Sequence, residues 1–167
     1  MVKVYLSLGS NLGDRESNLA QATMALSVEI NIFNVVSSAY YESEPLYNLS
    51  QPDFLNSVLR CDTSLRAFDF FDVTNKIEKM LGRVKNKKRN QPRIIDIDIL
   101  FFGDSVLETS ELTIPHPSFQ FRKFVLIPFA EIEPNFKVPN QGISINKLIT
   151  NCPDQTNVRT HFMKSQA

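Results

Sequence analysis

Several residue types are scarce in this chain of 167 residues, and each scarcity excludes a class of protein. Cys61 and Cys152 are the only cysteines, too few for a disulfide scaffold and without the spacing of a zinc site. His116 and His161 are the only histidines, which excludes a histidine-rich metal site. No run of about 18 apolar residues occurs, so no membrane-spanning helix is expected. The net charge is zero, which argues against a general coat for nucleic acid.

The apolar content of the chain is sufficient for one domain with a proper core. Hydrophobic residues make up 43% of the sequence, and no repeat or linker divides it, so residues 1–167 are expected to form a single domain. Residues 1–9 alternate apolar and polar side chains, which is typical of a strand and not of a signal peptide. We therefore expect a cytoplasmic protein.

Two aspartates stand one residue apart inside an otherwise apolar segment, residues 93–102. Because side chains alternate along a strand, Asp96 and Asp98 are predicted to share one face, with Cα atoms about 6.5–7 Å apart. Aspartate is depleted in strands, and burying an uncompensated carboxylate is costly. A pair of divalent cations would compensate both charges, as in sites that clamp transferring phosphates. A solvated sheet edge, or an ion pair with Arg93, is the alternative that this motif leaves open.

A run of basic residues precedes this strand. Residues 83–93 contain no acidic side chain and six basic ones: Arg83, Lys85, Lys87, Lys88, Arg89 and Arg93. Positive charge concentrated in a neutral chain favours a small anionic ligand over nucleic acid. Such a run is more often a solvated loop. Directly before two carboxylates, it predicts instead the cationic half of a polyphosphate site.

The order of the predicted elements indicates an α+β fold. Periodicity and capping residues predict a strand over residues 2–8, a helix from Asp14 to Val28, strands over Phe33–Glu42 and Phe54–Asp62, a helix from Ser64 to Gly82, and then the aspartate strand. This β-α-β-β-α-β order is the split βαβ of ferredoxin-like folds, with helices packed on a mainly antiparallel sheet. Further along, a turn is predicted at Gly103, a helix over residues 118–131 with a break at Pro128, and a frayed tail beyond Asn151.

Several segments together resemble a known family, the 6-hydroxymethyl-7,8-dihydropterin pyrophosphokinases of folate synthesis. The matching segments are Gly9–Gly13, Gln51–Asn56, Gly82–Arg83, Pro92–Ile99 and Ile114–Pro117, together with Arg122 and Phe124. They follow the order of the family from residue 5 to about residue 135. The Pro-Arg-x-x-Asp-x-Asp segment is the most specific of them, whereas the Gly-Ser-Asn-Leu segment alone would be weak.

The resemblance implies transfer of pyrophosphate from ATP to the hydroxymethyl oxygen of the pterin, with release of AMP. The residues that it assigns to catalysis are Arg83, Arg93, Asp96 and Asp98, and the two aspartates would hold two Mg²⁺ ions. The residues that it assigns to ATP are Glu78, Lys85, Arg89, Ile99, His116 and Arg122. The residues that it assigns to the pterin are Ser43, Pro45, Leu46, Phe54, Asn56 and Phe124. A monomer that acts without nucleic-acid or membrane partners is expected.

The chain departs from the family pattern beside the basic run. Asn90-Gln91 stand where the family usually has Trp-Gly, and the chain has no tryptophan. This change is expected to alter a mobile loop that closes over ATP. Lys85 stands where arginine is common, and a lysine cannot make the same bidentate phosphate contact.

Two other functions remain open. A different metal-dependent phosphoryl or nucleotidyl transferase on the same fold would release pyrophosphate instead of AMP, although polymerase-like sites usually draw their carboxylates from two strands. A non-enzymatic RNA-binding module would present aromatic side chains at alternating strand positions, and the predicted strands contain no such motif. The sequence favours the pyrophosphokinase.

Overall fold

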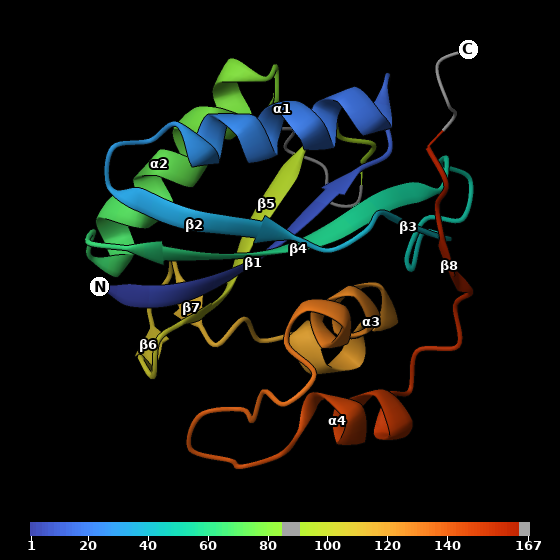
Figure 1. Ribbon diagram of the computed structural model, residues 1–167. Helices are drawn as coiled ribbons and strands as arrows, with labels where there is room; N and C mark the ends of the chain where they lie inside the picture. The colour runs from blue at the N-terminus through green and yellow to red at the C-terminus, as the bar shows by residue number, and fades with distance from the viewer. Residues whose placement is uncertain (85–90, 164–167) are drawn as a thin grey trace.

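A six-stranded sheet separates two groups of helices in the computed structural model, which describes residues 1–84 and 91–163 (Figure 1). The strands of this sheet are β1 (Val2–Ser10), β2 (Ile32–Ser37), β3 (Tyr41–Ser43), β4 (Phe54–Thr63), β5 (Asp96–Phe102) and β8 (Val158–Thr160). The helices are α1 (Arg15–Ser27), α2 (Ala67–Met80), α3 (Lys123–Ile132) and α4 (Ile145–Asn151), with a 3-10 turn, η1 (Phe119–Phe121), before α3. Strands β6 (Leu107–Glu108) and β7 (Thr113–Ile114) form a separate ribbon.

The strand order confirms the predicted fold class. The order is β5-β1-β4-β3-β8, with β2 paired to another part of β4, and every pairing is antiparallel. Strand β1 therefore lies between β4 and the aspartate strand β5, as a ferredoxin-like arrangement requires. Within the described ranges, no helix has the length and apolar character needed to cross a bilayer.

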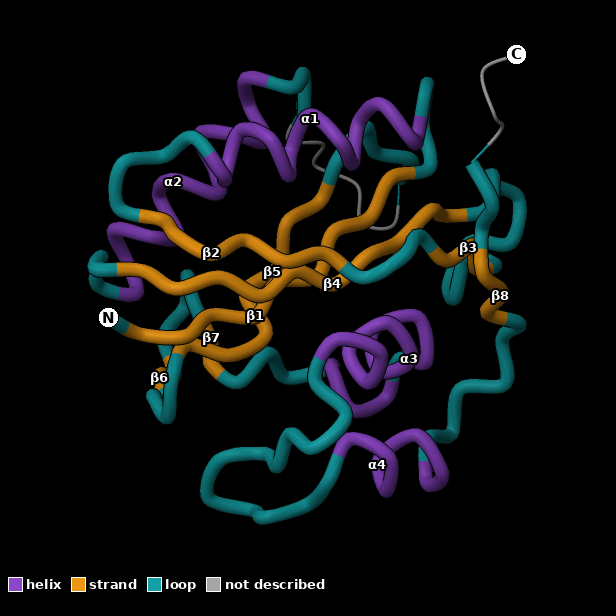
Figure 2. Tube along the Cα trace, viewed as in Figure 1, coloured by secondary structure: helices purple, strands orange, loops and turns teal. Residues whose placement is uncertain are grey.

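The two faces of the sheet carry different cores (Figure 2). Helices α1 and α2 cover one face, where Leu6 and Ile97 pack into an aliphatic core. Helices α3 and α4 cover the other face, where Tyr5, Phe101 and Phe129 form an aromatic core. Since Asp96 and Asp98 alternate with isoleucines of the first core, their side chains face the α3 side of the sheet.

A β-bulge interrupts the alternation in β5. Tyr5 pairs with Phe101, but the next residue of β1, Leu6, pairs with Ile99, so Leu100 is an extra residue. Leu100 and Phe101 consequently both point into the aromatic core, whereas simple alternation would have placed Phe101 beside Ile99. The bulge adds an aromatic ring beneath α3, just beyond the two aspartates.

The predicted helix starts are right for α1 and early for α2. Asp14 caps α1 by accepting the backbone N–H of Ser17 at 3.0 Å, as predicted. Helix α2 begins at Ala67 and not at Ser64, because the Thr63 hydroxyl accepts the N–H of Leu65 and holds these residues in a turn.

The single strand predicted over residues 33–42 is wrong, since the structure divides it into β2 and β3. Ser38 lies between them and makes two bonds to β4: its N–H donates to the Val58 carbonyl, and its hydroxyl accepts the Val58 N–H. The bond to the Ser38 hydroxyl replaces the backbone hydrogen bond that a continuous strand would make to the Val58 N–H. The chain can therefore bend here without leaving that buried N–H unpaired.

Two predictions for the last third of the chain are also wrong. Pro128 lies inside α3, where it removes one backbone bond but is buried, and its neighbour Phe129 is fully buried in the aromatic core. Residues beyond Asn151 do not form only a frayed tail. They include β8, which pairs with β3, and the buried Asp154.

Candidate active site

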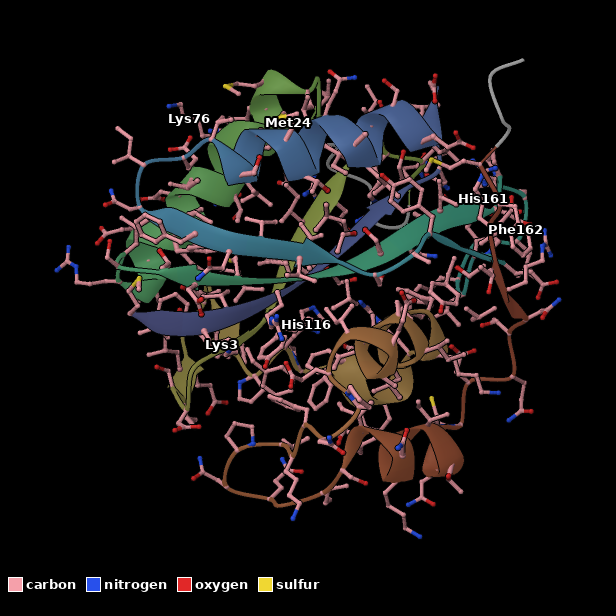
Figure 3. The ribbon with its side chains drawn as sticks, in the orientation of Figure 1. Lys3, Met24, Lys76, His116, His161 and Phe162 are labelled. Atoms are coloured by element: carbon pink, nitrogen blue, oxygen red, sulfur yellow. The ribbon has the colours of Figure 1, made fainter. Side chains whose placement is uncertain are left out.

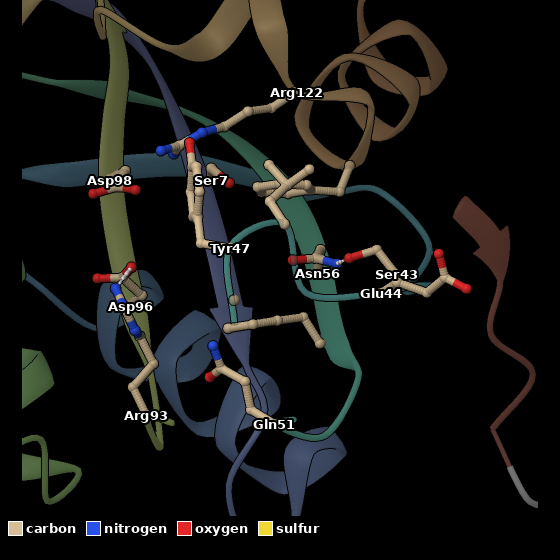
Figure 4. Close-up of a pocket in the computed structure, with 14 residues that line it drawn as sticks. Ser7, Ser43, Glu44, Tyr47, Gln51, Asn56, Arg93, Asp96, Asp98 and Arg122 are labelled. Carbon is tan, nitrogen blue, oxygen red and sulfur yellow. Dashed lines mark hydrogen bonds and ion pairs between the residues drawn. The ribbon is translucent and has the colours of Figure 1, made fainter. Parts of the chain in front are cut away.

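A pocket opens on the α3 face of the sheet, between β5 and the start of α3 (Figure 4). At one end the pocket is lined by Arg93, Asp96 and Asp98. These residues, together with Arg83 and His116, which contact the two aspartates, are called the charged end. At the other end lie Ser43, Phe54, Asn56 and Phe124, which we call the aromatic end. The close-up shows Asp96 and Asp98 across the pocket from Asn56 and Ser43.

Asp96 is held by two arginines in the charged end. Nη1 of Arg83 lies 2.7 Å from Oδ1 of Asp96, and Nη1 of Arg93 pairs with Oδ2. The second pair is local because Arg93 precedes Asp96 by three residues, whereas Arg83 arrives from the end of α2. The two guanidinium groups therefore converge on the aspartate strand from different elements.

Glu78 places Arg83. Its side chain is 6% exposed, accepts the N–H of Ile97 in β5 at 2.7 Å, and is ion-paired with Arg83. Burial raises the pKa of Glu78, and the charge of Arg83 partly offsets that effect. Gly82, at φ +94°, provides the left-handed turn that brings Arg83 back onto α2. The carboxylate of Glu78 is thus directed to Arg83 and β5.

The negative charge of Asp98 is compensated much less than that of Asp96. Its nearest ion-pair partner is Nε2 of His116 at 3.9 Å, and 38% of its side chain is exposed. Burial and then the charge of Asp96 raise the pKa of Asp98 to about 7, against the opposing charge of Arg122. Two adjacent carboxylates, of which Asp98 has no arginine partner within ion-pair distance in residues 1–84 and 91–163, suit a hard divalent cation. The described parts of the chain hold no cluster of three or more Asp, Glu, His or Cys ligands, so water and phosphate oxygens would have to complete the coordination.

His116 is a neutral hydrogen-bond donor at pH 7. Its Nδ1 accepts the backbone N–H of Ser118 at 3.1 Å, which leaves the ring proton on Nε2, the atom that faces Asp98. Burial and then the charge of Arg122 lower the pKa of His116 to about 4. Figure 3 places His116 on the α3 side of the sheet.

Arg122 reaches into the pocket from the residue before α3 (Figure 4). Its guanidinium carbon lies 5.8 Å from the centre of the Phe124 ring. Its Nε is buried, and within the described ranges no acceptor reaches it. A buried donor without a partner favours an anionic or carbonyl ligand at this point.

The aromatic end is organised around Asn56, which is 2% exposed. Its Nδ2 donates to the Ser43 hydroxyl at 2.9 Å and to the Tyr41 carbonyl at 3.3 Å. Gly9 lies opposite Asn56 in the sheet, and a Cβ there would come within 3.4 Å of the Asn56 Oδ1 and 3.8 Å of the Phe54 ring. The missing side chain leaves the floor of the pocket open for a flat ligand.

Five predicted residues lie outside the lining, and two others lie outside the described residues. Arg83 and His116 reach the pocket only through their contacts with Asp96 and Asp98. The Ile99 side chain is 4% exposed in the aliphatic core, so only its backbone is available to a ligand. Pro45 is buried behind the lining residue Leu46. Glu78 acts on Arg83 as described. Lys85 and Arg89 fall in the range 85–90, which the structure does not describe.

The structure adds lining residues that the predictions did not assign: Ser7, Gly9, Glu44, Tyr47 and Gln51. Ser7 pairs with Asp98 and Gly9 with Asp96 across β1 and β5. Alternation along β1 from the buried Tyr5 would have found both. Glu44 and Tyr47 belong to an irregular loop for which the sequence carries no comparable signal.

Asn11 ties the two ends of the pocket together and was also missed as a site residue. Its N–H donates to the Arg93 carbonyl at 3.1 Å, and its Oδ1 accepts the Arg93 N–H at 2.9 Å. Its Nδ2 donates to the Gln51 side chain at 3.0 Å and to the Pro52 carbonyl at 3.2 Å. One buried side chain therefore joins the start of the aspartate strand to the loop before β4.

Residues 5–134 match the family described as 7,8-dihydro-6-hydroxymethylpterin-pyrophosphokinase. The chain belongs to this family. Pyrophosphoryl transfer from ATP to hydroxymethyldihydropterin in folate biosynthesis is the activity that the pyrophosphokinase family and its relatives indicate.

Similar pyrophosphokinases occur alone and as parts of longer proteins. The chain is 34% identical to the 2-amino-4-hydroxy-6-hydroxymethyldihydropteridine pyrophosphokinase of Haemophilus influenzae, covering 95% of this chain and 98% of that protein. It is 39% identical to the folic acid synthesis protein FOL1 of Dictyostelium discoideum, covering 93% of this chain and 23% of that protein. The chain thus spans about a quarter of this second relative.

Solved structures support the fold. A crystal structure of the Plasmodium falciparum HPPK-DHPS protein with pteroate matches 90% of this chain and 42% of its own, with a TM-score of 0.69 at 18% identity. At that identity the likeness concerns the fold alone.

Proposed function

We propose that this chain catalyses attack of the pterin hydroxymethyl oxygen on the β-phosphorus of ATP. The bond from that phosphorus to the oxygen bridging the α- and β-phosphates breaks, AMP leaves, and the hydroxyl proton passes to solvent. The observation that carries the proposal is a single pocket with a carboxylate pair and arginines at one end and an amide and two aromatic side chains at the other. Such a pocket can hold a polyphosphate and a flat heterocycle in line.

The charged end is proposed to bind the phosphates. Asp96 and Asp98 would hold two Mg²⁺ ions, which supply charge neutralisation and orientation of the phosphate oxygens. Arg83 and Arg93 are paired with Asp96 and are within reach of a phosphate beside it. Transferring their hydrogen bonds from Asp96 to the phosphates would stabilise charge on the group in transfer. Lys85 and Arg89 are proposed to add positive charge from the neighbouring run.

His116 and Arg122 are proposed to bind ATP oxygens from the α3 side. The Nε2 proton of His116 faces the charged end, and a neutral imidazole donates a hydrogen bond without repelling Mg²⁺. The Nε of Arg122 is a buried donor that a phosphate oxygen would satisfy. The backbone of Ile99 is proposed as a further contact for the nucleotide, with Glu78 acting through Arg83.

The aromatic end is proposed to bind the pterin. Phe54 and Phe124 would stack on its two faces, with Asn56 at the pterin edge. The backbone around Ser43, Pro45 and Leu46 would complete the slot. Gly9 would lie under the ring, where a side chain would collide with it.

AMP release from ATP and Mg²⁺, measured with and without 6-hydroxymethyl-7,8-dihydropterin, tests the proposal. AMP that forms only with the pterin, together with pyrophosphorylated pterin in equal amount, is the expected result. Release of pyrophosphate instead of AMP would contradict it and indicate a nucleotidyl transferase. Asp98→Asn is the matched control, because it keeps the shape of the side chain and removes its charge.

Three further features belong to the same proposal. We expect the chain to form one pyrophosphokinase domain, to act as a monomer and to work in the cytoplasm. Gel filtration with light scattering across the range of assay concentrations tests the oligomeric state, and a mass above one chain would contradict a monomer.

A further inference from the structure

The segment after α4 returns to the sheet and touches both walls of the pocket. Residues 152–161, which we call the C-terminal strap, run from α4 to β8 and along β3 (Figure 1). The strap lies beyond the family match, which ends at residue 134. Figure 3 places His161 at the end of the strap, beside the outer strands of the sheet.

Asp154 fixes the wall formed by α3. Its Oδ2 accepts the backbone N–H of Lys123 at 2.9 Å, and its Oδ1 accepts the N–H and hydroxyl of Thr156 at 2.8 and 2.6 Å. The residue before α3, Arg122, makes no side-chain cap, so Asp154 supplies the cap from 31 residues away. Lys123 stands between the lining residues Arg122 and Phe124. The cap therefore fixes the backbone from which both side chains reach the pocket.

Arg159 fixes the opposite wall. In the β3–β8 pairing it lies across from Glu42, and its Nη2 is 3.2 Å from Glu42 Oε2 and 3.4 Å from Asp53 Oδ2. Glu42 directly precedes Ser43, and Asp53 directly precedes Phe54. Both following residues line the pocket. A single guanidinium thus joins the two strands that carry the aromatic end.

Neighbouring ion pairs make this contact part of a network. Arg15, in the first turn of α1, lies 2.8 Å from the other oxygen of Glu42 and donates to the Asp53 carbonyl at 2.9 Å. His161 donates its backbone N–H to the Tyr40 carbonyl at 2.8 Å. Glu42 is 19% exposed at its side chain. Burial opposes its charge, yet Arg15 and Arg159 together lower the pKa of Glu42. A shared, half-buried network restrains its members more than an isolated surface pair does.

We propose that the C-terminal strap positions the aromatic end, with Asp154 and Arg159 as positioning residues that hold its two walls at the spacing a pterin requires. The proposal rests on the proposed function, since it takes the flat ligand of this pocket to be the pterin. Neither residue lines the pocket, so both act through residues that do. Loosening the strap at Arg159 should weaken pterin binding and leave nucleotide binding unaffected, whereas loosening it at Asp154 should also disturb Arg122 and so weaken nucleotide binding to a smaller extent.

The test is calorimetric binding of 6-hydroxymethyl-7,8-dihydropterin, and separately of a non-hydrolysable ATP analogue with Mg²⁺, to the full chain and to strap variants. Asp154→Ala and Arg159→Ala are each expected to weaken pterin binding about 5-fold, and the double variant about 20-fold, as for loss of a helix cap or a networked ion pair. Binding of the ATP analogue should change by less than about 2-fold in Arg159→Ala, and in Asp154→Ala by less than the loss for pterin, because Asp154 also holds the backbone next to Arg122. Asp154→Asn keeps an acceptor for the Lys123 N–H and is expected to recover most of the loss.

Arg66→Ala is the matched control, because it breaks an Arg–Asp pair on α2 that does not line the pocket. It should change neither affinity. A folded double variant with the pterin affinity of the unaltered chain would overturn the proposal, as would equal losses for both ligands in Arg159→Ala. Failure of the unaltered chain to bind pterin would instead overturn the proposed function, and the inference with it.

Discussion

The two ends of the pocket are built in opposite ways. Three of the five residues of the charged end lie within residues 83–96, and two of its ion pairs, Glu78–Arg83 and Arg93–Asp96, join residues no more than five positions apart. The aromatic end takes Ser43 from β3, Asn56 from β4 and Phe124 from α3, and its walls are held by residues of the C-terminal strap. A site for charge can be specified locally, whereas a slot for a flat ring depends on the spacing of distant elements.

The largest effect should come from the charged end. Asp98→Ala is expected to lower kcat by at least about 10²-fold, because one carboxylate of the pair that would hold Mg²⁺ is gone. Pterin affinity without ATP should change little. Steady-state AMP release and pterin titration measure the two quantities. Unchanged turnover would show that Asp98 does not serve the reaction.

A smaller effect, confined to the aromatic end, should follow Gly9→Ala. The added methyl would lie 3.4 Å from Asn56 Oδ1 and 3.8 Å from the Phe54 ring, in the space proposed to lie beneath the pterin. We expect pterin affinity to fall about 10-fold while affinity for an ATP analogue is retained. Calorimetry with each ligand separately tests this. Equal losses for both would mean that the two ends are not separable at β1.

Asn11→Ala should weaken the binding of both substrates, because Asn11 is bonded to both ends of the pocket. It removes hydrogen bonds to Arg93 on one side and to Gln51 and Pro52 on the other. We expect KM to rise about 5-fold for both substrates, with a loss of about 1–3 kcal/mol in the free energy of unfolding. Asn18→Ala is a suitable control, since this side chain bonds the neighbouring Ser10 and Leu12 instead. A rise in KM for one substrate only would contradict the linking role.

The smallest effect is expected in the pH dependence of the free energy of unfolding, measured without Mg²⁺. Folding raises the pKa of Asp98 from 3.8 to about 7, through burial and the charge of Asp96. Its proton is therefore bound more tightly in the folded state, so the resulting stabilisation is present below about pH 4 and is lost as the pH rises to 7. Because 38% of the side chain is exposed, solvent screening reduces the effect.

Asp98→Asn removes that titration. At pH 7.5 without Mg²⁺ it is expected to raise Tm by about 2–4 °C, equivalent to about 1 kcal/mol, and the gain should vanish at pH 4. Differential scanning calorimetry at both pH values measures it. A lower Tm at pH 7.5 would show that the charge of Asp98 is already compensated within the protein.

Elements whose signals are local could be predicted from the sequence alone. Alternation in β1 and around Asp96 and Asp98, the Asp14 cap and the glycine at the end of α2 all act within a few residues, so the fold class followed from them. The family resemblance named most residues of the pocket lining from its motifs.

Features that depend on partners far along the chain could be seen only in the folded protein. Ser38 divides a predicted strand because Val58 is there to bond it, and Pro128 stays helical because the aromatic core packs against α3. The strap becomes ordered because β3 offers an edge and Lys123 an unpaired N–H. In each case, contacts with residues far along the chain outweigh the local conformational preference. Local sequence patterns do not report the strength of those distant contacts, so these features could not be predicted from them.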